Sequence, residues 1–329
     1  MNNEDEFQDL ATGVKKTLDE FYKYYSDNIE SWIETQSEDR EKANQWKRKV
    51  YKIGAVPFLL FNVLIFVWLG LASIYFYLLF ALSIIIYVAV AHGPTGDLDD
   101  KIGLKIEAGL WAFLKLLPLP QEYALDTQLF YKNHILEEHN KVKAGKAFTG
   151  RDEGVEFSAQ HFSLKNKTSG NEYLRVFRGI LVYAEFDNEF TQKTLILKDR
   201  GKLLNSIVRK AMGSGFQRIN MSYKEFEDLY EVYAADQVEG RSLLSPDVMS
   251  ILIDLQNVIP ECEWIQILMS GNKFYMAIDT GMIDNFDFTF HWDEKIGNEP
   301  PENLVKLAKE MAVIRVIMSA FDVLKRKKK

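Results

Sequence analysis

The densest group of polar side chains that could act together chemically is the stretch Asp236-Gln-Val-Glu239-Gly-Arg241. Two carboxylates and a guanidinium at this spacing could orient a ligand or take part in acid–base catalysis. The same residue types also form ordinary salt-bridged helix starts, and Arg178 could be a structural partner of that kind. Asp236, Glu239 and Arg241 are therefore the catalytic candidates, weighed against a structural role, and the sequence leans away from an enzyme.

The spacing of the histidines does not match that of a metal site. The chain contains His92, His134, His139, His161 and His291. The run from His134 to His139 superficially resembles a zinc-binding helix, but five positions correspond to about 140° around a helix, whereas ligands on one face need spacings of three or four. His161 alternates with Val155 and Phe157 on a predicted strand, which is typical of a core or surface histidine. We expect no metal and no cofactor.

Other motifs of catalysis are missing from the sequence. Gly213-Ser-Gly215 lacks the Lys and Ser or Thr of a phosphate-binding loop, and no Gly-X-Ser-X-Gly nucleophile elbow occurs. Cys262 is the only cysteine, so an intrachain disulfide framework and a cysteine-based zinc cluster are excluded. The net charge of −7 gives no indication of a nucleic-acid binder.

The elements that position these residues are arranged around Ile53–Ala91, a stretch without a charged side chain. As one helix it would be about 58 Å long, roughly twice the length that crosses a bilayer. Two helices joined by a tight reversal satisfy all backbone groups inside lipid. We predict a transmembrane hairpin with its bend at Gly70–Ser73. A single tilted helix and a buried hairpin of a soluble protein are the alternatives. Asn62 would hydrogen-bond locally within the hairpin.

The flanks of this apolar segment predict its orientation. Six basic residues precede it: Arg40, Lys42, Lys47, Arg48, Lys49 and Lys52. Lys and Arg near membrane crossings stay on the cytoplasmic side, so both termini are expected in the cytoplasm. Lys101 and Lys105 after the second span agree with this orientation.

An apolar stripe runs along the N-terminal segment in steps of three and four. It includes Phe7, Leu10, Val14, Leu18, Phe21 and Tyr25. The stripe predicts an amphipathic helix, and its average period is close to that of a coiled coil. Packing on the chain's own domain, contact with a second copy or another protein, and contact with the membrane all remain open, although the acidic opposite face disfavours the membrane.

Two further segments are candidates for the membrane surface. His92-Gly93-Pro94-Thr95-Gly96 is predicted to break the helix, and Leu98–Leu117 is predicted to lie at the head groups or to pack on the following domain. The second segment contributes Trp111, Lys101 and Lys105. The terminal run with Lys327, Lys328 and Lys329 could attract anionic lipid or simply be a solvated helix end.

Beyond residue 146 the period of two predicts strands. They are expected at Val155–Phe162, Tyr173–Phe186, Phe190–Leu197, Trp264–Met269 and Lys273–Ile278. Turns are expected at Asn166–Asn171, Asp187–Glu189 and Ser270–Asn272. Helices are expected at Gln121–Lys143, Gly201–Met212, Val248–Val258 after the helix opening Ser245-Pro246-Asp247, and Glu302–Lys325. The inner face of the last helix is expected to carry Leu304, Leu307, Met311, Ile314, Ile317 and Phe321. These elements predict an α+β domain on an antiparallel sheet.

Two stretches of this domain resemble a known family. They are Phe177-Arg-Gly-Ile-Leu-Val-Tyr-Ala-Glu-Phe-Asp-Asn-Glu-Phe-Thr-Gln-Lys-Thr-Leu-Ile-Leu197 and Glu231-Val-Tyr-Ala-Ala-Asp-Gln-Val-Glu-Gly-Arg-Ser-Leu-Leu-Ser-Pro-Asp-Val-Met249. Both resemble the bacterial membrane-protein family with a domain of unknown function, DUF3137, although Gly240 stands where that family usually has Ala. The resemblance implies a bacterial inner-membrane protein with a cytoplasmic domain, and it implies no catalytic residue.

Together these features predict four parts. They are an N-terminal cytoplasmic helical segment (1–52), a transmembrane helical hairpin (53–91), juxtamembrane and connecting helices (92–145) and a cytoplasmic α+β domain (146–329). The first hypothesis is a membrane-anchored binding or scaffold protein with a protein partner or a second copy. The alternatives are an enzyme on membrane or envelope substrates that uses the Asp236 region, and an oligomeric channel or transporter component.

Overall fold

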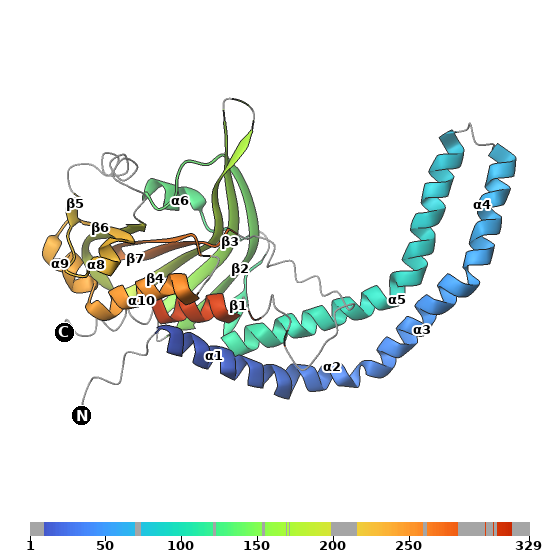
Figure 1. Cartoon of the computed structure of the whole chain (residues 1–329), viewed down its shortest axis with the longest axis horizontal. Helices are drawn as coiled ribbons and strands as arrows, with labels where there is room; N and C mark the ends of the chain where they lie inside the picture. Colours follow the sequence, from blue (N-terminus) through green and yellow to red (C-terminus); the bar gives the residue numbers. More distant parts are fainter. Residues whose placement is uncertain are drawn as a thin grey trace. The chain divides into compact units, whose positions relative to one another are not determined.

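The structure is a computed structural model that describes residues 10–69, 74–120, 123–152, 155–168, 170, 172–198, 216–258, 262–281, 300, 305 and 308–317. It is an α+β structure with helices and a large antiparallel sheet, as predicted (Figure 1). Two compact units are present. A helical unit comprises Lys23–Gly109 and Phe288–Pro300, and a sheet unit comprises Met1–Tyr22, Leu110–Asp287 and Pro301–Lys329.

In the part of the chain that the structure describes, six helical segments precede the sheet. They are α1 (Leu10–Tyr24), the π-helical turn η2 (Tyr25–Glu30), α2 (Ser31–Thr35), α3 (Ser37–Ile53), α4 (Ala55–Leu69) and α5 (Ile74–Leu114). The N-terminal stripe therefore does form a helix, as the spacing of its apolar residues predicts. Gly54 separates α3 from α4, and the two helices meet at a bend of 42°.

The predicted break at residues 92–96 is wrong, because α5 continues through it. Pro94 lacks the N–H that would bond to the Val90 carbonyl four residues earlier. The indole Nε1 of Trp46 donates to that carbonyl instead, at 3.0 Å. Figure 1 shows that α5 changes direction along its length rather than ending. A side chain from another helix thus satisfies the acceptor that the proline leaves open.

The sheet contains seven strands among the residues described. They are β1 (Leu116–Pro118), β2 (Lys141–Asp152), β3 (Val155–Lys167), β4 (Tyr173–Lys198), β5 (Gln217–Ile219), β6 (Tyr230–Ala234) and β7 (Trp264–Asp279). All pairs are antiparallel, in the order β1-β2-β3-β4-β6-β5, with β7 paired to β4. The first half of β4 pairs with β3, the second half pairs with β6, and β7 follows β4 along both halves.

Two predicted turns lie inside continuous strands. Asp187–Glu189 falls within β4, and Ser270–Asn272 falls within β7, so the predicted β7 hairpin is wrong. The register between β4 and β7 shifts between Glu185 and Phe190 and again between Phe190 and Thr194. The extra β4 residues at such irregularities bend a strand without ending it. These register shifts accommodate the turn-forming residues within continuous strands.

Short helices connect the strands. They are α6 (Thr127–Lys132), α8 (Lys224–Glu227), α9 (Gln237–Leu243) and α10 (Pro246–Val258). The opening of α10 confirms the predicted helix start. The predicted helix over residues 121–143 is wrong: Asp126 caps α6, His134 follows it with a positive φ of 62°, and β2 has begun by Lys141. The helix predicted over residues 201–212 lies outside the described residues.

The core of the sheet unit occupies both faces of the sheet. On one face, residues of the α6 region, among them Phe130 and Leu136, pack on Phe162 and Leu164 of β3. On the other face lies a helix over residues 308–317, whose Met311, Ile314 and Ile317 are buried as predicted. The predicted inner positions Leu304, Leu307 and Phe321 lie outside the described residues.

Candidate functional site

The outward surfaces of α4 and α5 are the most unusual surface of this chain. Six large apolar side chains of α4 are each 54–74% exposed: Val56, Leu59, Leu60, Val63, Leu64 and Val67. On α5, Ile74, Tyr75, Leu78 and Ile85 are 62–69% exposed. Exposed apolar area on this scale marks a protein or membrane contact.

Among the described residues, one helical segment is long and apolar enough to cross a membrane, namely Tyr77–Pro94 of α5. The bent pair Glu41–Ile53 and Ala55–Trp68 meets the same criterion only when it is counted as one broken span. At 1.5 Å per residue, the 15 residues of α4 are about 22 Å long, so α4 needs the end of α3 to match a hydrocarbon core of about 30 Å.

A polar link joins α4 to α5 at the middle of the apolar segment. Asn62 and Ser83 are 7% and 9% exposed. The Ser83 hydroxyl donates to Asn62 Oδ1 at 2.9 Å, and Asn62 Nδ2 donates to the Phe58 carbonyl at 2.8 Å. The predicted local pairing of Asn62 is confirmed, with its partners on α4 and α5. This link fixes which faces of the two helices meet.

Aromatic side chains join the helices near the α3–α4 bend. The Tyr87 hydroxyl donates to the Val50 carbonyl at 3.1 Å, and the Tyr87 ring stacks on Phe58 with centroids 4.7 Å apart. Tyr51 Oη lies 3.0 Å from His92 Nε2. These contacts, with that of Trp46 to Val90, form a polar and aromatic border at the basic end of the apolar segment.

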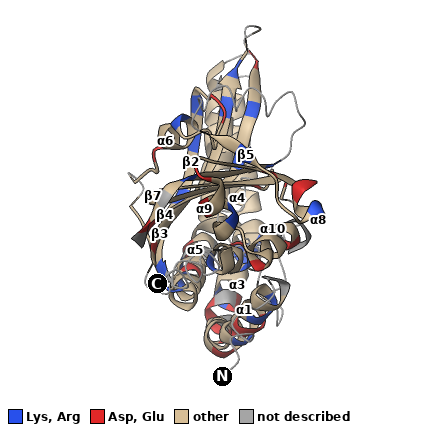
Figure 2. Ribbon diagram, turned by 90° about the vertical axis from the view of Figure 1, so that its left-hand side faces the viewer, with Lys and Arg blue, Asp and Glu red and all other residues tan. Residues whose placement is uncertain are grey.

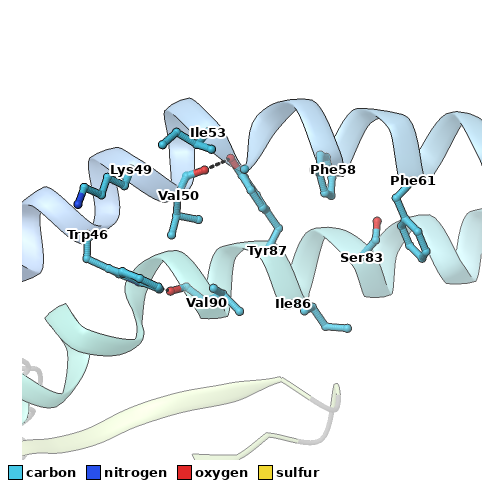
Figure 3. A pocket seen from close by; sticks show the side chains of 11 residues that line it. Trp46, Lys49, Val50, Ile53, Phe58, Phe61, Ser83, Ile86, Tyr87 and Val90 are labelled. Atoms are coloured by element: carbon cyan, nitrogen blue, oxygen red, sulfur yellow. Dashed lines mark hydrogen bonds between the residues drawn. The ribbon is translucent and has the colours of Figure 1, made fainter.

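A groove opens between these helices, with a volume of about 620 Å³ (Figure 3). We call it the α3–α5 groove. It is lined by Trp46, Lys49, Val50, Ile53, Gly54, Phe58, Phe61, Ser83, Ile86, Tyr87 and Val90. In Figure 3 Lys49 and Trp46 lie toward one end of the groove and Phe61 toward the other. Its walls are almost wholly apolar, and Lys49 is its one charged lining residue. The sequence did not reveal this groove, because it depends on how α5 pairs with α3 and α4.

The predicted catalytic cluster lies at the start of α9. Asp236 is the N-cap, and its Oδ1 accepts hydrogen bonds from the backbone N–H groups of Val238 at 2.7 Å and Glu239 at 2.9 Å. Glu239 is 9% exposed and Arg241 is exposed. An aspartate in this position satisfies backbone donors that a helix start leaves open. The geometry is that of a capped helix start, and the catalytic role of these residues stays a prediction.

The predicted membrane-surface residues are in different environments. Trp111 is 5% exposed, and its ring centroid is 5.6 Å from that of Phe148, so this ring packs inside the sheet unit. Lys101 and Lys105 are exposed, and Lys105 Nζ lies 5.8 Å from the ring centroid of Trp32. Lys327, Lys328 and Lys329 lie outside the described residues.

The N-terminal stripe is buried within the chain where it is described. Val14, Phe21 and Tyr25 are at most 2% exposed, and the Phe21 and Phe113 centroids are 5.4 Å apart. Leu18 is partly buried; Phe7 lies outside the described residues, as does the side chain of Leu10. The stripe therefore has intramolecular contacts, and its contact with a partner stays a prediction.

The buried polar residues described in the sheet unit include a histidine–glutamate pair and an aspartate that binds backbone N–H groups. His161 Nε2 of β3 lies 3.4 Å from Glu310 Oε2, with the side chains 2% and 4% exposed. Asp279, 1% exposed, accepts hydrogen bonds from the backbone N–H groups of Arg178 and Gly281, and burial raises the pKa of its carboxyl. Both groups join strands or helices of the core. In the described part of the chain, no three His, Cys, Asp or Glu side chains are grouped to hold a metal ion.

Residues 175–323 match the family model described as Protein of unknown function (DUF3137), so the resemblance is confirmed over that part of the chain. Comparisons with curated proteins and with solved structures gave no match. The matched residues begin in β4 and include the Asp236 cap, whereas α4, α5 and the α3–α5 groove lie before them.

Proposed function

We propose that α4 and α5 anchor this chain in the bacterial inner membrane as a two-helix hairpin, and that the sheet unit is a cytoplasmic binding or scaffold module. The observation that carries the proposal is the apolar, exposed outer surface of both helices. Water opposes the exposure of such a surface by about 25 cal/mol per Å². Hydrocarbon accepts it, provided that the polar groups are satisfied internally.

The polar features of the hairpin suit a bilayer. Asn62 and Ser83 hydrogen-bond to each other at mid-depth. Trp46, Tyr51 and Tyr87 gather at one end, where aromatic side chains favour the membrane–water interface. The basic end of α3 adjoins this border, so the positive-inside rule supports a cytoplasmic location for both chain ends.

The sheet unit offers a cationic surface for an acidic partner. Lys141 stands opposite Lys165, and Lys165 stands opposite Arg175, so three exposed cations share one cross-strand row. Figure 2 shows several basic positions on the strands above α6. Like charges directly opposite each other are destabilising. Arg175 has a salt bridge to Glu263, 2.5 Å away, and an acidic segment of a partner would neutralise the rest of the row.

Membrane anchoring is tested by placing charge on the outer face of α4. The double substitution Leu60→Arg and Leu64→Arg puts two cations at the middle of the proposed span, where each costs about 2.5–3.5 kcal/mol. We expect wild-type protein to stay with membranes after alkaline carbonate extraction and the double variant to be released or degraded.

The matched control is Leu174→Arg, since Leu174 is 59% exposed and Leu60 is 60% exposed. Leu174 lies in β4, and its replacement should leave membrane retention unchanged. Extraction of the wild-type chain by carbonate, or equal release of the control and the double variant, would overturn the anchoring proposal.

A further inference from the structure

We propose that the α3–α5 groove binds one anionic phospholipid, with an acyl chain along its apolar walls and the head-group phosphate at Lys49. This inference rests on the proposed membrane insertion, and it adds a specific ligand to it. A hairpin that only anchors the chain would contact lipids without choosing among them.

The shape and chemistry of the groove fit an amphiphile. Its volume of about 620 Å³ lies within the range of about 300–1,000 Å³ that is usual for small-molecule sites. The polar atoms of its lining are mostly engaged already: the Ser83 hydroxyl bonds to Asn62 and the Tyr87 hydroxyl bonds to Val50. The body of the groove is therefore suited to a hydrocarbon chain.

A glycine, a helix bend and a hydrogen bond keep the groove open. At Gly54 a Cβ atom would lie 2.5 Å from the Val50 carbonyl oxygen and 3.2 Å from the Tyr87 ring, so only glycine allows this approach. The α3–α4 bend of 42° occurs at the same residue. On the α5 side, the bond from Trp46 to the Val90 carbonyl fixes the indole in the lining. A preformed site of this kind requires little ordering when a ligand binds.

The charge at the end of the groove selects the head group. Lys49 is exposed, and no salt bridge to it is present among the described residues. Arg48 and Lys52, its neighbours on α3, are also exposed and add positive potential. A net anionic head group is attracted by this positive potential. A zwitterionic head group is attracted less, because its own cation is repelled. A second copy of this chain would bring its own basic α3, so it fits the charge poorly.

Native mass spectrometry of the full chain in detergent tests the inference. The protein is incubated with equal amounts of phosphatidylglycerol and phosphatidylcholine that carry the same acyl chains. We expect one phosphatidylglycerol to be retained preferentially. Lys49→Gln should reduce that preference by about fivefold, the effect of one interfacial charge, and Lys49→Arg should keep it.

Two variants separate the groove from general surface charge. Lys52→Gln removes an exposed lysine of the same helix that does not line the groove, and it should lower the preference clearly less than Lys49→Gln does. Ile86→Trp fills the groove from α5 and should abolish retention of both lipids. Circular dichroism and a monodisperse elution profile show whether each variant is folded.

The inference is overturned if wild-type protein shows no head-group preference, if Lys52→Gln lowers the preference as much as Lys49→Gln, or if Ile86→Trp still retains lipid. A lipid-free dimer that Ile86→Trp disrupts would assign the groove to a second copy instead. Carbonate extraction separates the two proposals. A chain that resists extraction but retains no specific lipid refutes only this inference, and a chain that is extracted refutes anchoring itself.

Discussion

At the scale of single residues, Gly179 lies where the backbone of β7 comes close to β4. A Cβ atom there would be 1.9 Å from the Ile278 carbonyl oxygen and 3.0 Å from the Thr280 backbone nitrogen. Both obstacles are backbone atoms, so no side-chain rotation relieves the clash. This glycine is required by the pairing of two long strands, and not by a turn.

Gly179→Ala should therefore lower the free energy of unfolding by about 1–3 kcal/mol or more, because the strands must separate to admit the methyl group. Urea unfolding followed by tryptophan fluorescence measures the change. Gly170→Ala is the matched control: its nearest contact would be the Thr168 hydroxyl at 3.8 Å, and the expected change is within about 0.5 kcal/mol. Equal midpoints for the two variants would contradict this account of Gly179.

At the scale of elements, the stability of variants at the start of α9 distinguishes a helix cap from a catalytic site. Asp236→Ala leaves the N–H groups of Val238 and Glu239 without their acceptor, so we expect a loss of about 1 kcal/mol in unfolding free energy. Arg241→Ala removes an exposed side chain and should cost less than about 0.5 kcal/mol.

Asp236→Asn and Asp236→Ser provide the control for the cap, since both keep an acceptor oxygen at the N-cap and should recover most of the lost stability. The cap interpretation fails if the Asn and Ser variants are as unstable as the Ala variant. It also fails if Asp236→Ala is as stable as wild type.

Local chemistry explains which elements the sequence could predict. The start of α10 was predicted because Ser245, Pro246 and Asp247 specify a helix opening by themselves. The sequence does not predict that β4 continues through Asp187–Glu189, because those residues suit a turn as well as an irregular strand. Pairing with the distant β7 determines which of the two forms. Likewise, α5 continues past Pro94 because of Trp46, which is 44 residues from the acceptor it bonds to.

Much less of the candidate site could be predicted than of the fold. The apolar segment, its basic flank and the role of Asn62 followed from residue types alone. The α3–α5 groove depends on the bend at Gly54 and on the pairing of Val50 with Tyr87, and neither has a local pattern. Trp111 was expected at the membrane surface because its segment is amphipathic, yet amphipathicity does not specify what covers the apolar face.

At the scale of the whole molecule, the anchoring proposal predicts the side on which each part lies. In a Cys262→Ser chain, single cysteines are introduced by Glu34→Cys, Ile74→Cys or Arg241→Cys, all at exposed positions. A membrane-impermeant maleimide should label Ile74→Cys in spheroplasts, and the other two only after lysis. The native thiol is removed because it would complicate the readout, although burial raises the pKa of Cys262 to about 12 and slows its reaction.

Labelling of Glu34→Cys and Arg241→Cys from opposite sides would leave a single crossing and refute the hairpin. Reaction of all three cysteines in intact spheroplasts would place the sheet unit outside the cytoplasm. Detergent-treated samples of each variant, labelled to completion, provide the reference for full accessibility.

The unbroken course of α5 from Ile74 to Leu114 has a mechanical consequence. A continuous helix can transmit a change of tilt from one end to the other. In the proposed membrane insertion, a bilayer that thins or thickens would change the tilt of the apolar half of α5. That rotation would be absorbed by bending at Pro94 or transmitted along α5 to Leu114. In the proposed arrangement, the lipid environment would thereby act on the far end of α5 without any ligand.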